Sequence, residues 1–373
     1  MRRFLTFMVR RTLAALFTIW AIVTISFFVF WAIPQEPAQF VYPLAQHLTP
    51  YMVKHGNHLL GTDRPLLTQY GDYLWHLLQG DFGRQWDGAQ LVNNASLTRI
   101  PIGPQLQQWL PVTLSIVLGG AVLVVLLSVP LGAIAGKRIG ALSDRTISLV
   151  ALLGICTHPM VIGLILRGIF GEHFHWAPVG GYCPLTGGPS QGGGPPTGPV
   201  DPLQVPGAFG GSCGGVVDWS SHLVLPWLTF ALLFLALYTR MIRASVAETL
   251  PEDYIRTARA KGAGELRVMT RHVLPNASIR VLTMVGMEVG TAIGVCAYLE
   301  TAYNMNGLGR EAIFTMIGAR GLDLPVVLAI VTAITLIVVI GNLLVDALYA
   351  VVDPRVRFGA QETRTKSLAG GMI

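Results

Sequence analysis

The most regular feature of the chain is a series of long apolar runs with few charged residues. The first, Leu13 to Ile33, has 21 residues without a charge, and a helix of that length crosses a hydrocarbon core of about 30 Å. Five further runs follow, at Leu110 to Ala135, Thr146 to Leu166, Leu223 to Thr239, Val281 to Leu299 and Val326 to Val345. The pattern predicts an all-α membrane protein with six transmembrane helices.

The composition places the chain in the same class. Only 12% of its 373 residues are charged, about half of the roughly 25% usual in soluble domains, and the mean hydropathy is +0.55. The net charge of +6 does not indicate a nucleic-acid-binding protein, because the basic residues flank apolar runs where membrane topology already requires them. A soluble enzyme and a disulfide scaffold are excluded.

The distribution of basic residues predicts the orientation. Of the 26 Lys and Arg residues, 19 lie on the face that carries both termini, and cytoplasmic loops hold the excess of such residues. Both termini should therefore be cytoplasmic, in a multi-pass protein of the cytoplasmic membrane. We expect four regions: the N-terminus and first helix (1–33), an extracytoplasmic loop domain (34–109), the membrane core (110–350) and a cytoplasmic tail (351–373).

A second outer loop, 171–222, is rich in small and rigid residues. It holds 14 Gly and 8 Pro in 52 residues, a composition that offers little apolar surface to offset the entropy cost of ordering. Cys183 and Cys213 both fall in this loop, outside the reducing cytosol. The sequence is compatible with a disulfide between them and equally with two free thiols.

The chain lacks the motifs of nucleotide binding and of catalysis. Its only Gly-Lys pair, Gly136-Lys137, is followed by Arg138, so no phosphate-binding P-loop is present. There is no His-Glu-x-x-His or Cys-x-x-Cys motif, and the nine His residues do not cluster at metal-ligand spacing. We expect no catalytic residue, metal site or cofactor in this chain, so that any ATP and magnesium would be bound by partner chains.

The cytoplasmic loop 240–280 carries the strongest local signal. Thr249 and Glu252 have the spacing of a capping box, with Pro251 suited to a first helical turn, and Gly262 suits a left-handed residue after a helix end. A second helical stretch, Glu265 to His272, is expected to end before Leu274-Pro275. A solvated basic loop that only sets topology would also fit.

This loop resembles the conserved cytoplasmic loop of binding-protein-dependent ABC importer permeases, with Gly262 and Leu274-Pro275 at the family spacing. The general pattern begins Glu-Ala-Ala where this chain has Arg256-Thr257-Ala258, a variant similar to that of dipeptide and oligopeptide permeases. In that family the loop forms a coupling helix. The resemblance implies that the residues coupling to the ATPases are Glu252, Asp253, Tyr254, Arg256, Thr257, Ala258, Arg259, Ala260, Lys261 and Gly262.

Other motifs extend the resemblance over most of the chain. They include the Arg-rich N-terminus, Gly80-Asp81-Phe82-Gly83-Arg84, Glu300-Thr301-Ala302-Tyr303, Gly307-Leu308-Gly309-Arg310 and Asp346-Ala347-Leu348-Tyr349. Two features depart from the family pattern. Asn304-Met305-Asn306 replaces a more usual Trp-Pro, and the Gly/Pro-rich insert is peculiar to this chain or its near relatives.

The resemblance implies a type I importer fold and a set of partners. These would be a second homologous permease subunit, two ABC ATPase subunits and an extracytoplasmic peptide-binding protein. The implied function is import of short peptides, with ATP hydrolysed by the partner chains. Permeases for nickel or glutathione share these motifs, so those substrates remain open.

One carboxylate lies inside a predicted span. Glu288 would cost about 3 kcal/mol if it faced lipid, so it should face the bundle interior. It either lines the substrate path or has a structural partner such as His158. A proton-coupled secondary transporter using Glu288 and His158 is the alternative from another class, but it leaves the capped cytoplasmic loop unexplained.

Overall fold

The fold was obtained as a computed structural model and is mostly helical. It describes residues 2–32, 36–42, 45, 47–87, 90–92, 96–142, 144–147, 149, 154, 157–186, 188–189, 212–213, 215–317 and 322–352. The middle of the Gly/Pro-rich insert and nearly all of the predicted cytoplasmic tail lie outside the described residues. The helical character expected from the apolar runs is confirmed.

The elements follow one another along the chain in a simple order. The first half contains α1 (Arg2–Trp31), α2 (Ala38–Val41), α3 (Pro50–Leu60), α4 (Leu66–Leu78), β1 (Gln90–Val92), β2 (Ser96–Thr98), α5 (Ile102–Lys137), α7 (Pro159–Leu166) and the π-helix η1 (Arg167–His173). The second half contains β3 (Gly188–Pro189), β4 (Ser212–Cys213), α8 (Val216–Thr249), α9 (Asp253–Ala260), α10 (Glu265–Val268), the π-helix η2 (Met269–Val273), α11 (Leu274–Ala302), α12 (Leu308–Met316) and α13 (Leu324–Val352).

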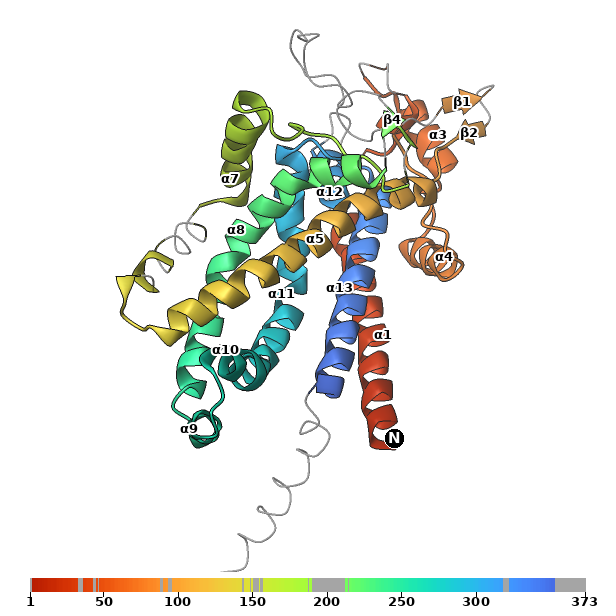
Figure 1. The fold of residues 1–373 in the computed structure, drawn as a ribbon. Helices are drawn as coiled ribbons and strands as arrows, with labels where there is room; N and C mark the ends of the chain where they lie inside the picture. The colour runs from red at the N-terminus through yellow and green to blue at the C-terminus, as the bar shows by residue number, and fades with distance from the viewer. Residues whose placement is uncertain are drawn as a thin grey trace, which may run out of the picture.

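The long helices pack into one bundle. α5 lies against α8, α11 contacts both α8 and α13, and α13 packs against α1 (Figure 1). The short helices α9 and α10 lie at the end of the bundle that holds the N-terminus, whereas α3, α12 and the short strands lie at the opposite end (Figure 1). The predicted cytoplasmic loop and the predicted outer loops are thus at opposite ends of the molecule.

Small residues allow α5 and α8 to approach closely. On α5, a Cβ atom added at Gly120 would collide with Phe230 of α8, and one added at Gly132 would collide with Ile242. Both glycines are buried in the interface. Close contact through small residues is how membrane helices gain packing energy without help from water.

Four of the six predicted spans are matched by helices that are long and apolar enough to cross a membrane, among the residues searched. These are Met8–Trp31, Ile102–Lys137, Val216–Thr249 and Leu324–Leu348. The fifth predicted span falls inside α11, which is 29 residues long. The total of six remains a prediction.

The third predicted span, Thr146 to Leu166, does not form the single helix that was expected. Several of its residues lie outside the described part of the chain, and a new helix, α7, begins at Pro159. His158 precedes it in an extended conformation and caps it through its ring nitrogen. The break has a steric cause, because a residue before proline is disfavoured in the helical region.

The outer part of the chain between α1 and α5 is built on the bundle itself. Trp86 and Phe40 pack with Phe27 of α1 and Leu324 of α13 in one buried cluster. In the second outer loop, Cys183 and Cys213 form a disulfide, with Cα atoms 5.6 Å apart. This bond brings together the two ends of the Gly/Pro-rich insert.

Candidate functional site

The predicted coupling helix exists but begins later than its sequence indicated. α9 starts at Asp253, with Glu252 as its N-cap and no side-chain capping hydrogen bond. Thr249 belongs to α8, where its hydroxyl donates to the backbone carbonyl of Ser245. The expected capping box between Thr249 and Glu252 is therefore wrong, because Thr249 is taken up by the end of the preceding helix.

α9 ends in the left-handed turn that Gly262 predicted. Gly262 has a φ of +84°, which residues with a side chain rarely adopt. Its N–H donates to the Arg259 carbonyl at 2.9 Å, and the Ala263 N–H donates to the Ala258 carbonyl at 3.1 Å. These two bonds form a Schellman motif, so Gly262 fixes the direction in which the chain leaves the helix.

One side chain holds α9 against the bundle. Ile255 is fully buried and packs with Ile242 and Val246 of α8 and with Val268 and Val273 of the following helices. It is the only buried residue of α9. Ile255 therefore joins α9 by apolar contact to the C-terminal part of α8 and to the segment that follows α9.

The remaining residues of the predicted coupling set leave most of their surface open. Tyr254 is 44% exposed, and the side chain of Asp253 is 97% exposed. Glu252, Arg256, Thr257, Arg259, Ala260, Lys261 and Gly262 are exposed, and Ala258 is half-buried. The helix thus combines one buried anchor with an open polar and aromatic surface.

Glu265 connects the predicted coupling helix to α5. Its carboxylate lies 2.9 Å from Nε of Arg259 and 3.2 Å from Nζ of Lys137, at the last turn of α5. The hydrogen bonds from Lys137 and Arg259 lower the pKa of Glu265, so its carboxylate is charged at neutral pH. α9 is therefore linked to α5 by charge and to α8 by apolar packing.

A second ion pair joins the segment after α5 to α8. Arg243 of α8 donates through Nε and Nη2 to both carboxylate oxygens of Asp144, a two-point geometry. The Gly140 N–H also donates to Asp144, at 2.8 Å. These hydrogen bonds lower the pKa of Asp144, and the bond from Arg243 has the larger effect. The pair fixes the C-terminal ends of α5 and α8 relative to each other.

The helix expected to end before Leu274-Pro275 continues instead. α10 passes into η2 and then into α11, with Pro275 in the first turn of α11. A proline inside a helix removes one hydrogen bond and crowds the preceding turn. The wider π turn immediately before it is a known way to accommodate such a defect. α10 is therefore continuous, through η2, with α11, a helix that runs through the bundle.

The structure separates the two residues proposed as a titrating pair. Glu288 is half-buried in α11, and its electrostatic neighbour is Tyr238 of α8. The His158 ring instead packs edge-on against Tyr298, with centroids 4.6 Å apart. Tyr298 lies ten residues beyond Glu288, about 15 Å along the helix axis. No contact joins Glu288 and His158 among the described interactions.

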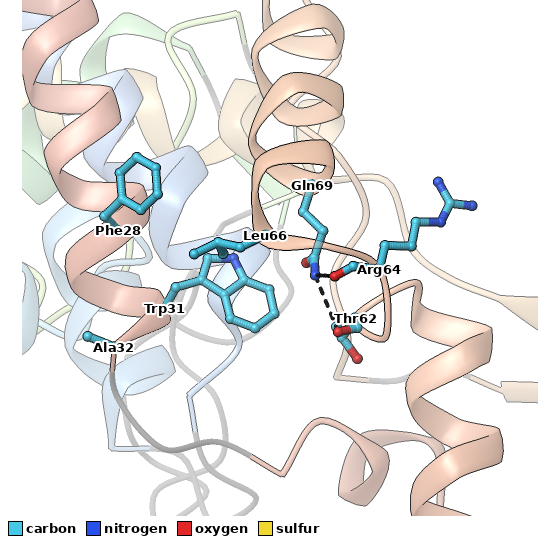
Figure 2. Close-up of a pocket in the computed structure, with 7 residues that line it drawn as sticks. All are labelled: Phe28, Trp31, Ala32, Thr62, Arg64, Leu66 and Gln69. Carbon is cyan, nitrogen blue, oxygen red and sulfur yellow. Dashed lines mark hydrogen bonds between the residues drawn. The ribbon is translucent and has the colours of Figure 1, made fainter.

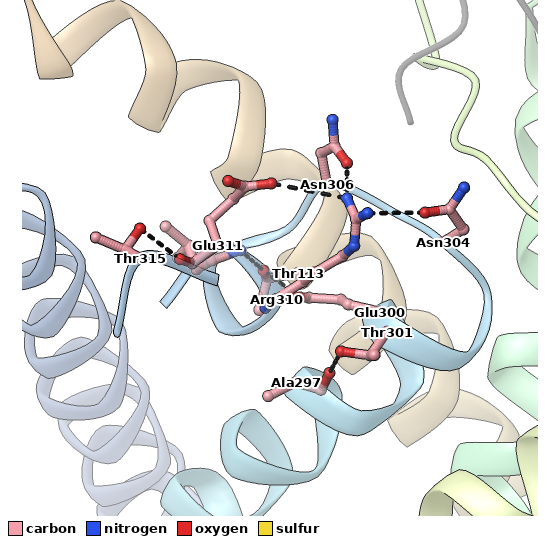
Figure 3. Close-up of polar contacts among 10 residues, drawn as sticks. Thr113, Ala297, Glu300, Thr301, Asn304, Asn306, Arg310, Glu311 and Thr315 are labelled. Atoms are coloured by element: carbon pink, nitrogen blue, oxygen red, sulfur yellow. Dashed lines mark hydrogen bonds and ion pairs between the residues drawn. The ribbon is translucent and has the colours of Figure 1, made fainter. Parts of the chain in front are cut away.

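A buried polar cluster lies at the end of the bundle opposite the N-terminus, where the sequence predicted no site. Glu300 of α11 is fully buried, and one of its oxygens accepts from the Thr113 hydroxyl of α5 at 2.6 Å. Its other oxygen accepts from the Arg310 N–H at 2.8 Å, and Thr113 accepts from the Leu308 N–H (Figure 3). The carboxylate therefore caps α12 and ties three helices together.

The segment Asn304-Met305-Asn306 takes part in this cluster. The guanidinium of Arg310 donates to the side-chain oxygens of Asn304 and Asn306 (Figure 3). It also lies 4.8 Å from the ring centre of Phe314. Asn304 has a φ of +51°, a conformation that asparagine tolerates better than most residues. The two asparagines thus hold the turn between α11 and α12. A glutamate at the outer end of an apolar run, followed by Gly-Leu-Gly, is the signal that could have revealed the cluster.

Family models match nearly the whole chain. Residues 128–358 match the family described as binding-protein-dependent transport system inner membrane component, and residues 4–117 match the model for the N-terminal part of such membrane components. The chain belongs to this family. Membership makes it a multi-pass transport component of the inner membrane rather than an enzyme, and it implies a binding protein and an ATPase as partners.

Curated relatives cover most of the chain. The probable peptide ABC transporter permease protein y4tP of Sinorhizobium fredii is 30% identical over 87% of this chain and 90% of its own length. The dipeptide transport system permease protein DppB of Escherichia coli K12 is 32% identical, covering 80% and 83%. The di/tripeptide permease DppB of Pseudomonas aeruginosa is 32% identical, covering 95% and 99%.

Proposed function

We propose that this chain is the membrane subunit through which short peptides enter the cell, driven by ATP hydrolysis on partner chains. The proposal rests chiefly on the form of α9, a short exposed helix that is anchored by the single buried side chain of Ile255. Relatives described as peptide, dipeptide and di/tripeptide permeases support the choice of substrate.

The mechanism follows from how α9 is attached. The exposed residues from Glu252 to Gly262 dock into a groove of an ATPase subunit. When the ATPases close on ATP, the force on α9 passes to α8 through Ile255 and to α5 through the Arg259–Glu265–Lys137 chain of charges. Because α5 and α8 pack together along the bundle, they move as a pair and switch the path between its two open states.

The complete transporter contains more than this chain. A second, homologous permease subunit forms the other half of the path, and two ATPases dock below the pair. In this proposal the ATPases bind ATP and magnesium, and this chain needs no cofactor of its own. The binding protein delivers the peptide to the outer end, where α12 and the disulfide-closed loop lie.

The orientation places α9 and both termini in the cytoplasm. The 19 of 26 basic residues on this face support it, as does the position of α9 and α10 at the N-terminal end of the bundle (Figure 1). Residues 34–109 and 171–222 then face outward. Membership of the binding-protein-dependent permease family argues against the alternative of a proton-coupled secondary transporter. The separation of Glu288 from His158 also argues against it, because that alternative needs the two residues to titrate as a pair.

The test is uptake of radiolabelled peptides by a strain that lacks this gene. Loss of di- and tripeptide uptake, restored by the wild-type chain, is the expected result. Nickel and glutathione uptake are measured alongside. A defect confined to nickel or to glutathione would overturn the peptide substrate while leaving the family assignment intact.

A further inference from the structure

The helix α4, in the outer region between α1 and α5, has an apolar surface that the rest of the chain leaves open. Leu67 is 73% exposed, Trp75 64% and Leu78 82%. None of the thirteen residues of α4 is buried. Three large apolar side chains on one short helix are more than scattered surface positions would explain.

These side chains lie on one side of the helix. At about 100° per residue, Leu67, Trp75 and Leu78 fall within one arc, next to the arc of Tyr70 and Tyr73 that packs on the bundle. The polar residues Asp72 and His76 lie opposite the middle of the combined arc that these five residues form. α4 therefore has a broad apolar face, of which the bundle covers only part.

Two hydrogen bonds fix the depth of α4 beside the bundle. The Tyr70 hydroxyl bonds the Thr24 hydroxyl of α1 at 2.7 Å, and the Tyr73 hydroxyl bonds the Thr332 hydroxyl of α13 at 2.9 Å. Thr24 is seven residues before the end of α1, and Thr332 is eight residues after the start of α13. At about 1.5 Å per residue, both lie some 10 Å inside the outer ends of these helices.

A hollow of about 350 Å³ lies where α4 meets α1 (Figure 2). Its apolar wall is formed by Phe28, Trp31 and Ala32 of α1 and by Leu66 of α4. On the other side, the Gln69 amide donates to the carbonyls of Thr62 and Arg64. The hollow is thus apolar toward α1 and polar toward the connection that precedes α4.

Arg64 completes the amphipathic pattern. Its guanidinium pairs with Asp72 at 3.3 Å, on the polar side of α4, and its side chain points away from Phe28 and Trp31 (Figure 2). The Arg64–Asp72 pair therefore lies on the polar side of α4, whereas Phe28 of α1 and Leu66 of α4, which are 37% and 40% exposed, line the same hollow. α1 is one of the candidate membrane spans.

We propose that α4 lies in the outer leaflet of the membrane, with Leu67, Trp75 and Leu78 among phospholipid acyl chains and an acyl chain filling the hollow beside Phe28 and Trp31. An interfacial helix of this kind buries its apolar face about 5–10 Å into the boundary between headgroups and acyl chains, which is compatible with the depth set by Thr24 and Thr332. Tryptophan is favoured at this level of a bilayer. Part of the region expected to be an extracytoplasmic cap is then a membrane anchor that holds the outer ends of α1 and α13.

The test is spin labelling of the complete transporter, purified through this chain and reconstituted in phosphatidylcholine–phosphatidylglycerol nanodiscs. The parent protein carries Cys156→Ala and Cys296→Ala. Labels are placed by Leu67→Cys, Trp75→Cys and Leu78→Cys, with Asp72→Cys and His76→Cys as controls on the same helix. Accessibility to oxygen, which partitions into lipid, is compared with accessibility to a water-soluble nickel chelate.

The expected ratio of oxygen to nickel accessibility is several-fold higher at positions 67, 75 and 78 than at 72 and 76. High nickel accessibility at all five positions would overturn the proposal, because α4 would then lie in water. Low accessibility to both reagents at 67, 75 and 78 would also overturn it, because another protein subunit would then cover this face.

Discussion

Lys137 lies 3.2 Å from Glu265, and this ion pair joins the last turn of α5 to the first turn of α10. Glu265 also binds Arg259 of the predicted coupling helix, so one carboxylate connects α9 to a long helix of the bundle. Exposed ion pairs contribute little to stability. Under the proposed mechanism the contribution of this pair is therefore geometric, since it links the position of α5 to that of α9.

The first prediction concerns that link. Lys137→Gln should leave the assembled transporter as stable as the wild type but lower peptide-stimulated ATP hydrolysis severalfold, whereas Lys137→Arg, which keeps the charge, should restore most of it. Stimulated hydrolysis is measured with the reconstituted complex. Equal stimulation in Lys137→Gln and the wild type would show that α5 does not receive force through Glu265.

The turn after α9 gives a second prediction. Gly262→Val should impair coupling, because a side chain at a φ of +84° costs about 1–2 kcal/mol and would redirect the chain that leaves α9. The matched control is Gly264→Ala. Gly264 has a φ of −65° and no atom within 4 Å of an added Cβ, so this variant should behave as wild type. Normal stimulation of ATP hydrolysis in Gly262→Val would show that this turn has no role in coupling.

The outer polar cluster gives a third prediction. A Cβ added at Gly307 would collide with the buried carboxylate of Glu300, so Gly307→Ala should destabilise the turn between α11 and α12 by about 1–3 kcal/mol. Gly103→Ala is the control, since nothing lies within 4 Å of its added Cβ. Thermal unfolding of the purified complex measures the difference. Equal midpoints for the two variants would mean that Glu300 does not fix this turn.

The fourth prediction is a pH dependence at the start of α13. Burial raises the pKa of Asp323 from 3.8 to about 6, although its carboxylate accepts from the N–H groups of Trp86 and Asp87. The folded protein therefore binds this proton more tightly than the unfolded chain does. The stabilising contribution is present below pH 3.8 and is lost as the pH rises to about 6.

Asp323→Asn should remove this slope, because asparagine cannot ionise and still offers an acceptor oxygen to Trp86 and Asp87. The observable is the unfolding temperature of the complex at pH 4.5 and at pH 7. Asp72→Asn, on the exposed side of α4, is the control and should keep the wild-type slope. An unchanged slope in Asp323→Asn would assign the pH dependence to other groups.

The sequence predicted those features that depend on composition and local spacing. Apolar runs of about twenty residues must become helices in a membrane, because a helix satisfies its own backbone hydrogen bonds. The left-handed turn at Gly262 was also predictable, since few other residues adopt it. By contrast, the predicted start of α9 was wrong, because capping-box spacing does not reveal that Thr249 already belongs to α8.

Long-range partners could not be read from the sequence. The contact between Thr113 and Glu300 joins residues 187 positions apart, and nothing in either local pattern indicates it. Glu288 was chosen as the notable carboxylate because it lies well inside a predicted span, whereas Glu300, at the edge of one, proved to be fully buried. The break before Pro159 was also missed, because the apolar character of a run does not indicate where its helix is interrupted.

The central claim is that ATPase subunits deliver work to this chain through α9. The most direct measurement is photo-crosslinking in intact cells, with a benzophenone amino acid replacing Tyr254 on α9 or, as the control, Tyr51 on α3, which is 74% exposed at the opposite end of the molecule. The account predicts an adduct with an ATP-binding subunit from position 254 and none from position 51. An ATPase adduct at position 51, or none at position 254 in an actively transporting strain, would contradict it.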